Sequence, residues 1–195
     1  MTNDEKESGM KRLNLGCGFD KRDGWVNADC FSDCSPDLLI DIRETPWPIP
    51  SNEYDHILMK HVLEHVGAGF DEFARIMKEL YRVLKTGGTL EIHVPHFRHD
   101  TWWSDPTHVR AFTALTFRMM SKRVNDDWIA QNANYTMIAH MLDIDFEIIE
   151  ALQVYDPVWY QKLLEGQITS DEIRTLAQTQ WGVVKELRFK LRAVK

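Results

Sequence analysis

The segment Leu13–Gly18 constrains the fold of this chain more than any other, because an apolar strand pattern ends there in a Gly-x-Gly turn. Glycine adopts backbone torsions, and permits close approaches, that a side chain would block. In a doubly wound α/β sheet, a turn of this kind after the first strand is where a nucleotide-like ligand lies against the backbone. Ordinary tight turns also contain Gly-x-Gly, so this interpretation needs support from the rest of the chain.

The chain alternates between strand and helix patterns. Residues 71–85 are the clearest amphipathic helix, and Gly87-Gly88 predicts its end. Its apolar residues recur at three- and four-residue steps: Phe73, Ile76, Met77, Leu80 and Leu84. Strand patterns cover residues 11–15, 25–29, 38–40, 54–59 and 89–94. This alternation predicts a mostly parallel sheet with helices on both faces.

The C-terminal part follows a different pattern. Residues 145–155 are a long strand-like run. Within residues 186–192, apolar and basic side chains alternate strictly from Leu187 to Arg192. Such alternation indicates a strand with one covered face and one wet, basic face, typical of a sheet edge. We therefore expect a pair of antiparallel closing strands. Residues 157–181 between them read as one or two short helices, the second capped by Thr169 or Ser170.

Length and composition limit the other possibilities. A chain of 195 residues is expected to form a single domain. It has no run of roughly 20 apolar residues that would span a membrane, and no secretory signal is visible at its start. Three cysteines, an odd number, favour a reducing, cytoplasmic setting. The net charge of −7 disfavours a nucleic-acid partner.

Two aspartates follow predicted strands where a nucleoside could be held. Asp29 ends the second strand, where a carboxylate can accept both hydroxyl protons of a ribose. Asp41 ends the third strand and precedes Ile42, where a carboxylate and a backbone N–H could meet an adenine edge. Together with the glycine turn, they predict one nucleoside site at the carboxyl ends of three successive strands.

At this point a family resemblance appears. The segments that carry it are LNLGCG (13–18), WVNADC (25–30), LIDIRETPWPIPSNEYD (39–55), HVLEHV (61–66) and ELYRVLKTGGTLEIHVPHF (79–97). On these residues the chain resembles the class I S-adenosylmethionine-dependent methyltransferases, in particular the type-11-like group. The resemblance spans roughly residues 11–97, with a fainter continuation to the C-terminus.

The resemblance implies an α/β fold: a doubly wound, mostly parallel seven-stranded sheet, Rossmann-like, with an antiparallel C-terminal strand pair. It implies S-adenosyl-L-methionine as cofactor. The cofactor residues it assigns are Gly16, Cys17 and Gly18 at the methionine part, Asp29 at the ribose, Asp41 and Ile42 at the adenine, and Lys60 and His61 at the sulfonium and substrate.

A single methyltransferase-like domain is expected over residues 1–195. Within it we expect a flexible N-terminus over residues 1–10. Residues 98–140 and 157–181 are predicted to be insertions on the substrate side.

The chain departs from the family pattern near the glycine turn. Asn14 stands where the family usually has an acidic residue, and Asp20 where it has a third glycine. Only six residues separate Gly18 from Trp25, whereas a parallel crossover normally needs about a dozen. The first helix of the fold is therefore predicted to be absent or reduced to a turn.

Methyl transfer from a sulfonium mainly requires alignment of donor and acceptor, and a base only where the acceptor must lose a proton. The predicted catalytic residues are His61, His96 and His108. His96 directly follows the fifth strand and is expected to face the same crevice as the cofactor. Other groups at the predicted rim that could accept a proton are Glu64, His65, His99 and Asp105.

The predicted function is transfer of a methyl group to an oxygen or nitrogen atom of a small-molecule acceptor. One alternative is a non-catalytic protein that binds S-adenosylmethionine or another nucleoside, suggested by Asn14 and the short crossover. A nicotinamide dehydrogenase is disfavoured, because Lys21 replaces the third glycine of its motif and no room remains for the helix. The sequence indicates no oligomeric state.

A metal-dependent enzyme is a further alternative. His61 and His65 have the i, i+4 spacing of metal ligands, and His96, His99, Asp100 and His108 are candidates to complete a site. Histidines and carboxylates beside a substrate crevice need no metal, however, and the expectation from the sequence is that no metal is bound.

Overall fold

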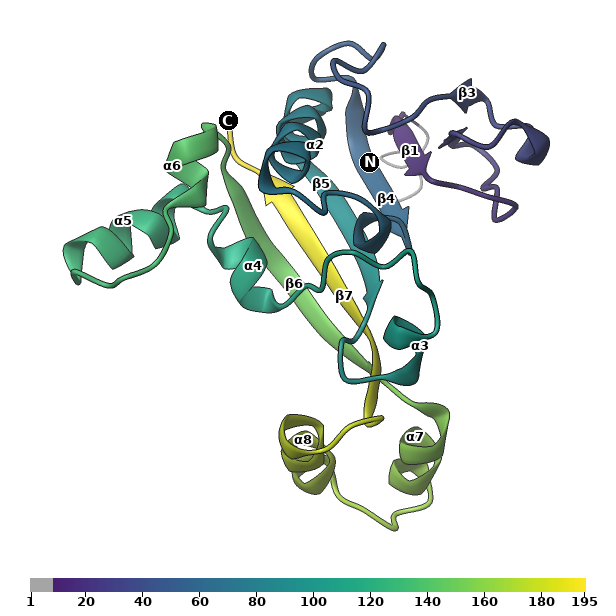
Figure 1. Ribbon diagram of the computed structural model, residues 1–195, viewed down its shortest axis with the longest axis vertical. Coiled ribbons are helices and arrows are strands. Elements are labelled where there is room, and N and C mark those ends of the chain that lie inside the picture. The colour runs from purple at the N-terminus through teal and green to yellow at the C-terminus, as the bar shows by residue number, and fades with distance from the viewer. Residues whose placement is uncertain (1–8) are drawn as a thin grey trace.

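The computed structural model describes residues 9–195 and contains a seven-stranded sheet with the order β3-β2-β1-β4-β5-β7-β6 (Figure 1). The strands are β1 (Arg12–Leu15), β2 (Val26–Asp29), β3 (Leu38–Leu39), β4 (Tyr54–Lys60), β5 (Leu84–Pro95), β6 (Phe146–Tyr155) and β7 (Val184–Ala193). Of the segment predicted to be flexible, residues 1–8 lie outside the described residues.

Strands β3, β2, β1, β4 and β5 pair in parallel, and β7 runs antiparallel to both of its neighbours. The predicted α/β sheet, mostly parallel with an antiparallel C-terminal strand pair, is confirmed.

The prediction that residues 186–192 form a sheet edge is wrong. β7 lies between β5 and β6, and β6 is the outermost strand. The basic face of β7 stays largely exposed, as predicted, but Lys190 has acidic neighbours on both sides, because it lies opposite Glu91 on β5 and Glu150 on β6. Opposite charges in such positions stabilise the pairing of strands.

The helices are α2 (Phe70–Val83), α3 (Asp100–Trp103), α4 (Ala114–Arg118), α5 (Lys122–Ala130), α6 (Ile138–Leu142), α7 (Pro157–Leu164) and α8 (Ser170–Thr179), with short 3-10 helices η1 (Ser32–Cys34) and η2 (Leu63–His65). α2 ends at Val83, earlier than predicted, because β5 begins directly at Leu84. Gly87 has a φ of +76° and lies within β5, where the pairing with β4 is irregular.

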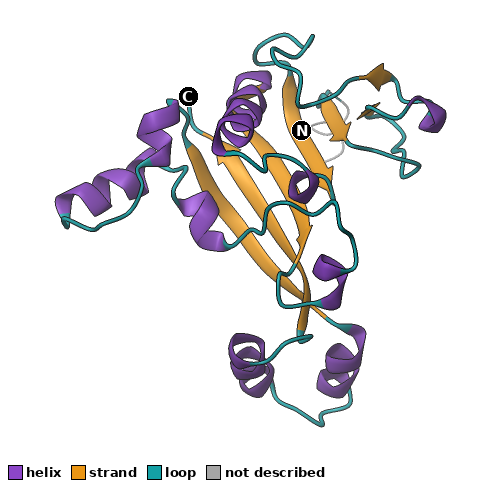
Figure 2. Cartoon of the chain, in the orientation of Figure 1, coloured by secondary structure: helices purple, strands orange, loops and turns teal. Residues whose placement is uncertain are grey.

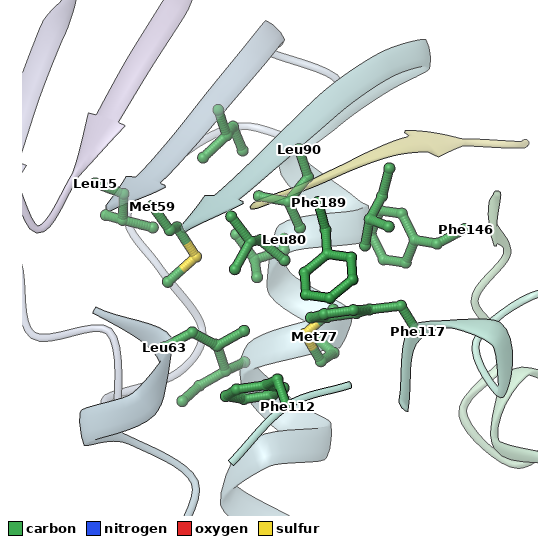
Figure 3. Packing of buried hydrophobic residues seen from close by; sticks show 14 of the residues in the cluster. Leu15, Met59, Leu63, Met77, Leu80, Leu90, Phe112, Phe117, Phe146 and Phe189 are labelled. Atoms are coloured by element: carbon green, nitrogen blue, oxygen red, sulfur yellow. The ribbon is translucent and has the colours of Figure 1, made fainter. Parts of the chain in front are cut away.

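The main core lies between the sheet and α2. Met77 and Leu80 of α2 point toward Leu90 of β5 and Phe189 of β7, and Phe117 of α4 packs beside them (Figure 3). All five side chains are at most 3% exposed. Each excludes apolar surface from water, so the helix is held to the sheet by burial.

The connection between β1 and β2 contains no helix, as the six-residue spacing predicted. Figure 2 shows that loops make up most of the chain from β1 to the start of β4, with η1 between β2 and β3.

The two predicted insertions contain all of the described α-helices except α2 and the end of α6. Residues 98–140 contain α3, α4, α5 and the start of α6, and residues 157–181 contain α7 and α8. Thr169 is the N-cap of α8, and its side chain and that of Glu172 form a capping box. Among residues 9–195, none of the helices has the length and apolar character needed to cross a membrane.

The loop between β3 and β4 is fastened to α2 by one carboxylate. Glu79 accepts a hydrogen bond from the Trp47 backbone N–H (2.7 Å) and two from the Arg82 guanidinium (2.7 and 2.8 Å). Arg82 also donates to the Ile49 carbonyl (2.8 Å). The hydrogen bonds from Arg82 hold the pKa of Glu79 below its ordinary value of 4.5. This contact fixes the loop that begins at Asp41 and Ile42.

We predict that Glu79→Gln lowers the free energy of unfolding by about 2–3 kcal/mol at pH 7, because a buried ion pair loses its charge. Since the folded-state pKa is depressed, the stabilisation by Glu79 is present above pH 4.5 and is lost as the pH falls below it. Chemical denaturation of both proteins between pH 7 and pH 3.5 should therefore show the difference shrinking. Glu44→Gln, at an exposed position in the same loop, is the control; an equal loss there would contradict the prediction.

Candidate active site

A cleft of about 390 Å³ lies at the carboxyl ends of β1, β2, β3 and β4. It is lined by Gly16, Gly18, Asp29, Cys30, Ile40, Asp41, Ile42, Arg43, His61, Val62, His65, Val66 and Thr107. Ligands of open α/β sheets bind at this edge, because the loops that follow the strands converge there. Six of the eight predicted cofactor residues are therefore brought together around one hollow: Gly16, Gly18, Asp29, Asp41, Ile42 and His61.

The glycine turn is held tightly against its neighbours. The backbone N–H groups of Gly16 and Cys17 both donate to the Ala28 carbonyl, at 2.8 and 3.0 Å. Gly16 has a φ of +74°, and a Cβ at this position would lie 2.3 Å from Val62 Cγ2. Both the torsion and the close approach therefore require glycine here.

Asp29 joins the glycine turn to the end of β2. One carboxylate oxygen accepts a hydrogen bond from the Gly18 N–H (2.8 Å), and the other accepts one from the Phe31 N–H (2.9 Å). Each carboxylate oxygen can accept a second hydrogen bond. Because the side chain is half-buried and lines the cleft, these remaining positions are available to a diol.

Asp41 is more fully occupied than Asp29. Its carboxylate accepts hydrogen bonds from Arg43 Nε (2.9 and 3.1 Å), Arg43 Nη2 (2.6 Å) and the Arg43 backbone N–H (2.9 Å). The hydrogen bonds from the guanidinium lower the pKa of Asp41. A nucleobase amine at this carboxylate would compete with Arg43. Ile42 is buried beside it, and its carbonyl accepts from Trp47 Nε1 (3.0 Å).

Two of the predicted cofactor residues, Cys17 and Lys60, do not line the cleft. Cys17 is buried, and burial raises the pKa of its thiol to about 11. Lys60 points to the glycine turn, where its Nζ donates to Asp20 Oδ2 (2.9 Å). This ion pair joins the end of β4 to the β1–β2 connection at an exposed position.

The departures from the family pattern have a structural use. The Asn14 side-chain amide is buried and donates to the Asp20 carbonyl (2.8 Å) and to Asn27 Oδ1 (3.1 Å). Asn27 Oδ1 also accepts from the Arg22 N–H (2.8 Å). These hydrogen bonds hold the short β1–β2 connection, which contains no helix. An ionised carboxylate at position 14 could not replace Asn14, because it would have no proton to donate.

A second hollow, of about 300 Å³, adjoins the cleft. It is lined by His61, Glu64, His65, Pro95, Thr101, Asp105, His108, Lys185 and Glu186. His61 and His65 line both hollows and therefore form the wall between them. Among the predicted catalytic residues, His61 and His108 lie here.

His61 is held between two carboxylates. Its Nε2 lies 2.9 Å from Glu186 Oε2, and its Nδ1 lies 3.3 Å from Glu64 Oε1. Pairing with Glu186, and then with Glu64, raises the pKa of His61 to about 9. Since both ring nitrogens face carboxylates, neither is free to take a proton from an acceptor, and the geometry does not support His61 as a general base.

His96 does not face the cleft, contrary to the prediction. It lines a separate hollow of about 420 Å³ together with Phe97, Ala151 and Phe189. The reason is strand alternation: Pro95 at the end of β5 lines the second hollow, so the next residue points to the other side. Burial lowers the pKa of His96.

Sequence reasoning did not identify Glu186 as part of the site. It comes from β7, far along the chain from β4, and only the strand pairing brings it to His61. Glu64 and His65 were noted as groups at the rim but were not among the predicted catalytic residues.

Comparisons with known proteins indicate a methyltransferase domain and the fold. A family model described as a methyltransferase domain matches residues 31–92. A crystal structure of an S-adenosylmethionine-dependent methyltransferase from Archaeoglobus fulgidus is similar, with a TM-score of 0.58, 16% identity, and coverage of 94% of this chain and 86% of that chain. No curated protein matches the chain.

Two further solved structures show what the fold accommodates. One is an S-adenosylmethionine-dependent methyltransferase from Methanosarcina mazei, with a TM-score of 0.55, 14% identity, and coverage of 100% of this chain and 98% of that chain. The other is the [4+2]-cyclase SpnF, with a TM-score of 0.54, 17% identity, and coverage of 95% of this chain and 75% of that chain. At these identities the likeness concerns the fold alone.

We predict that Asn14→Asp lowers the free energy of unfolding by about 1–3 kcal/mol, because a buried carboxylate replaces two donated hydrogen bonds with repulsion from the acceptors. Thermal and chemical denaturation at pH 7 measure the effect. Asn134→Asp, at an exposed position, should change stability little. If the two variants are equally stable, Asn14 does not hold the turn.

Proposed function

We propose that this chain is an S-adenosylmethionine-dependent methyltransferase that transfers a methyl group to an oxygen or nitrogen atom of a small molecule. The match of residues 31–92 to a methyltransferase domain and the fold support S-adenosyl-L-methionine as its cofactor. The observation that carries the proposal is that the cleft and the second hollow share the wall made by His61 and His65. A donor in one and an acceptor in the other would meet at this wall.

In this proposal the cofactor occupies the larger cleft. Asp29 accepts hydrogen bonds from the ribose hydroxyls, and the tight turn at Gly16 and Gly18 leaves its backbone open to the methionine part. Ile40 and Ile42 provide an apolar wall for the adenine, with Asp41 beside them.

The acceptor occupies the second hollow. Its volume of about 300 Å³ limits the acceptor to a small molecule, and its lining of histidines, carboxylates and Lys185 favours a polar one. His108 is better placed than His61 to take a proton, because only its Nδ1 is engaged, in a hydrogen bond to the Trp102 carbonyl (2.7 Å). The role of the enzyme is to align the acceptor atom with the methyl group and to exclude water.

We also propose a small-molecule substrate in place of nucleic acid, because the chain is acidic, with a net charge of −7. A reducing, cytoplasmic setting is supported by the three cysteines, Cys17, Cys30 and Cys34, which are all unpaired.

We predict that S-adenosylhomocysteine binds the full chain and that NAD does not. Asp29→Asn should weaken this binding about 5- to 150-fold, because an acceptor for the ribose hydroxyls is lost, a change of about 1–3 kcal/mol. Asp33→Asn, an exposed neighbour outside the cleft, is the matched control and should bind as the unmodified protein does. Isothermal titration calorimetry measures the affinity of the unmodified chain and of both variants for S-adenosylhomocysteine, and tests the unmodified chain with NAD.

Turnover distinguishes the enzyme from a binding protein. Formation of S-adenosylhomocysteine from S-adenosylmethionine is followed against a panel of small hydroxylated and amino compounds. Acceptor-dependent product would support methyl transfer, whereas tight binding of the cofactor without turnover on any acceptor would support a non-catalytic protein. Binding of NAD in its place would overturn the proposal.

A further inference from the structure

The second hollow contains three side chains that fit a metal ion. One donor atom each from Glu64, His65 and His108 lies within 4.8 Å of the others. Donors around a common ion, with bonds of roughly 2.1 Å, lie roughly 3–4 Å apart, so closing on an ion needs movements on the order of 1 Å. We propose that these residues bind a divalent transition-metal ion. The proposal departs from the expectation drawn from the sequence.

Glu64 is the strongest reason for the proposal. Its side chain is completely buried, it lines the hollow, and neither carboxylate oxygen has a hydrogen-bond donor. The nearest cationic group is His61, whose Nδ1 lies 3.3 Å from Oε1. Buried carboxylates are otherwise paired, hydrogen-bonded or bound to a metal. The contact with His61 is an ion pair outside hydrogen-bond geometry, so a cation in the hollow could still bind the Glu64 oxygens directly.

Both histidines present a free Nε2 lone pair. His108 Nδ1 lies 2.7 Å from the Trp102 carbonyl, which can only accept, so Nδ1 carries the proton. His65 Nδ1 lies 2.7 Å from Thr107 Oγ1, and the Thr107 hydroxyl donates to Asp105 Oδ1 (2.6 Å). The hydroxyl proton is therefore already used, and Thr107 accepts from His65.

This pattern is the one that supports metal ligands in general. The second ring nitrogen of a metal-binding histidine is usually hydrogen-bonded to a carbonyl or to a carboxylate-linked group, which fixes the tautomer and the ring orientation. Here the carbonyl of Trp102 and the Thr107–Asp105 pair supply these contacts.

The two segments that carry the ligands are also joined by their backbones. The Val109 and Arg110 N–H groups both donate to the Glu64 carbonyl, at 2.8 and 3.3 Å. Arg110 Nε donates to the Gly67 carbonyl (2.6 Å). These bonds hold His108 next to η2, which carries Glu64 and His65, without any help from an ion.

The donor set selects the class of metal. Two imidazoles and one carboxylate suit Zn²⁺, Fe²⁺, Mn²⁺ or Co²⁺, whereas Mg²⁺ and Ca²⁺ favour oxygen donors. Three protein ligands leave coordination positions open toward the hollow, as in catalytic sites. If the proposed function holds, an acceptor hydroxyl in this hollow would bind the ion and lose its proton to solvent more easily. A metal-bound His108 could not also accept that proton through Nε2, so the ion would replace His108 in this role. The metal site itself rests only on the side chains.

The test uses Co²⁺ and Zn²⁺ on the full chain after dialysis against a chelator, without cofactor. We expect one equivalent of Co²⁺ to give a visible absorption band and Zn²⁺ to displace it, since Zn²⁺ binds such sites more tightly. Glu64→Gln and His108→Gln should each weaken Zn²⁺ binding at least 100-fold. Thr107→Val, which leaves all ligands in place, should weaken it about 10–100-fold.

His140→Gln is the matched control, because His140 is an exposed histidine paired with Asp126 outside the site. It should bind Zn²⁺ as the unmodified chain does. Absence of a Co²⁺ band, or an unchanged Zn²⁺ affinity in Glu64→Gln and His108→Gln, would overturn the proposal. If circular dichroism shows that a ligand variant does not fold, two other results test the proposal. These are the displacement of Co²⁺ by Zn²⁺ in the unmodified chain and the Zn²⁺ affinity of Thr107→Val. Binding of S-adenosylhomocysteine is titrated separately, so failure of the metal site is distinct from failure of the proposed function.

Discussion

The short connection between β1 and β2 is the constraint on which the cleft depends. A parallel crossover normally uses a helix to return the chain and to shape the start of the next strand. Here the return is made by hydrogen bonds: Asn14 to the Asp20 carbonyl, Asp29 to the Gly18 N–H, and Lys60 to the Asp20 carboxylate. The glycine turn is therefore positioned by three side chains from three strands, and the shape of the cleft is set by polar contacts more than by helix packing.

This arrangement gives Asp29 two tasks. It holds the turn through one hydrogen bond on each oxygen, and the same oxygens face the cleft. Asp41 is tied in a similar way, through Arg43, and its loop is fastened to α2 by Glu79. Because the Asp29 carboxylate is already oriented, little side-chain freedom remains to be lost when a ligand binds there, which favours affinity. At Asp41 a ligand would first have to displace Arg43.

Much of the fold could be predicted because its signals are local. The strand of residues 186–192 is visible because Leu187, Phe189 and Leu191 all face the core, but its own alternation does not say which strands pair with it, so its interior position was missed. His96 was misplaced because a shift of one residue at a strand end reverses the direction of a side chain. Glu186 could not be predicted as part of the site, because only the pairing of β7 with β5 brings it to His61.

The side chain of His65 is shared by the two hollows. Its ring lines both, and its orientation is set by Thr107, which lies in the segment that also carries His108. Anything that fixes this ring from the side of the second hollow also fixes part of the wall of the cleft. If a ligand in one hollow changed the affinity of the other through this ring, the effect would be equal in both directions.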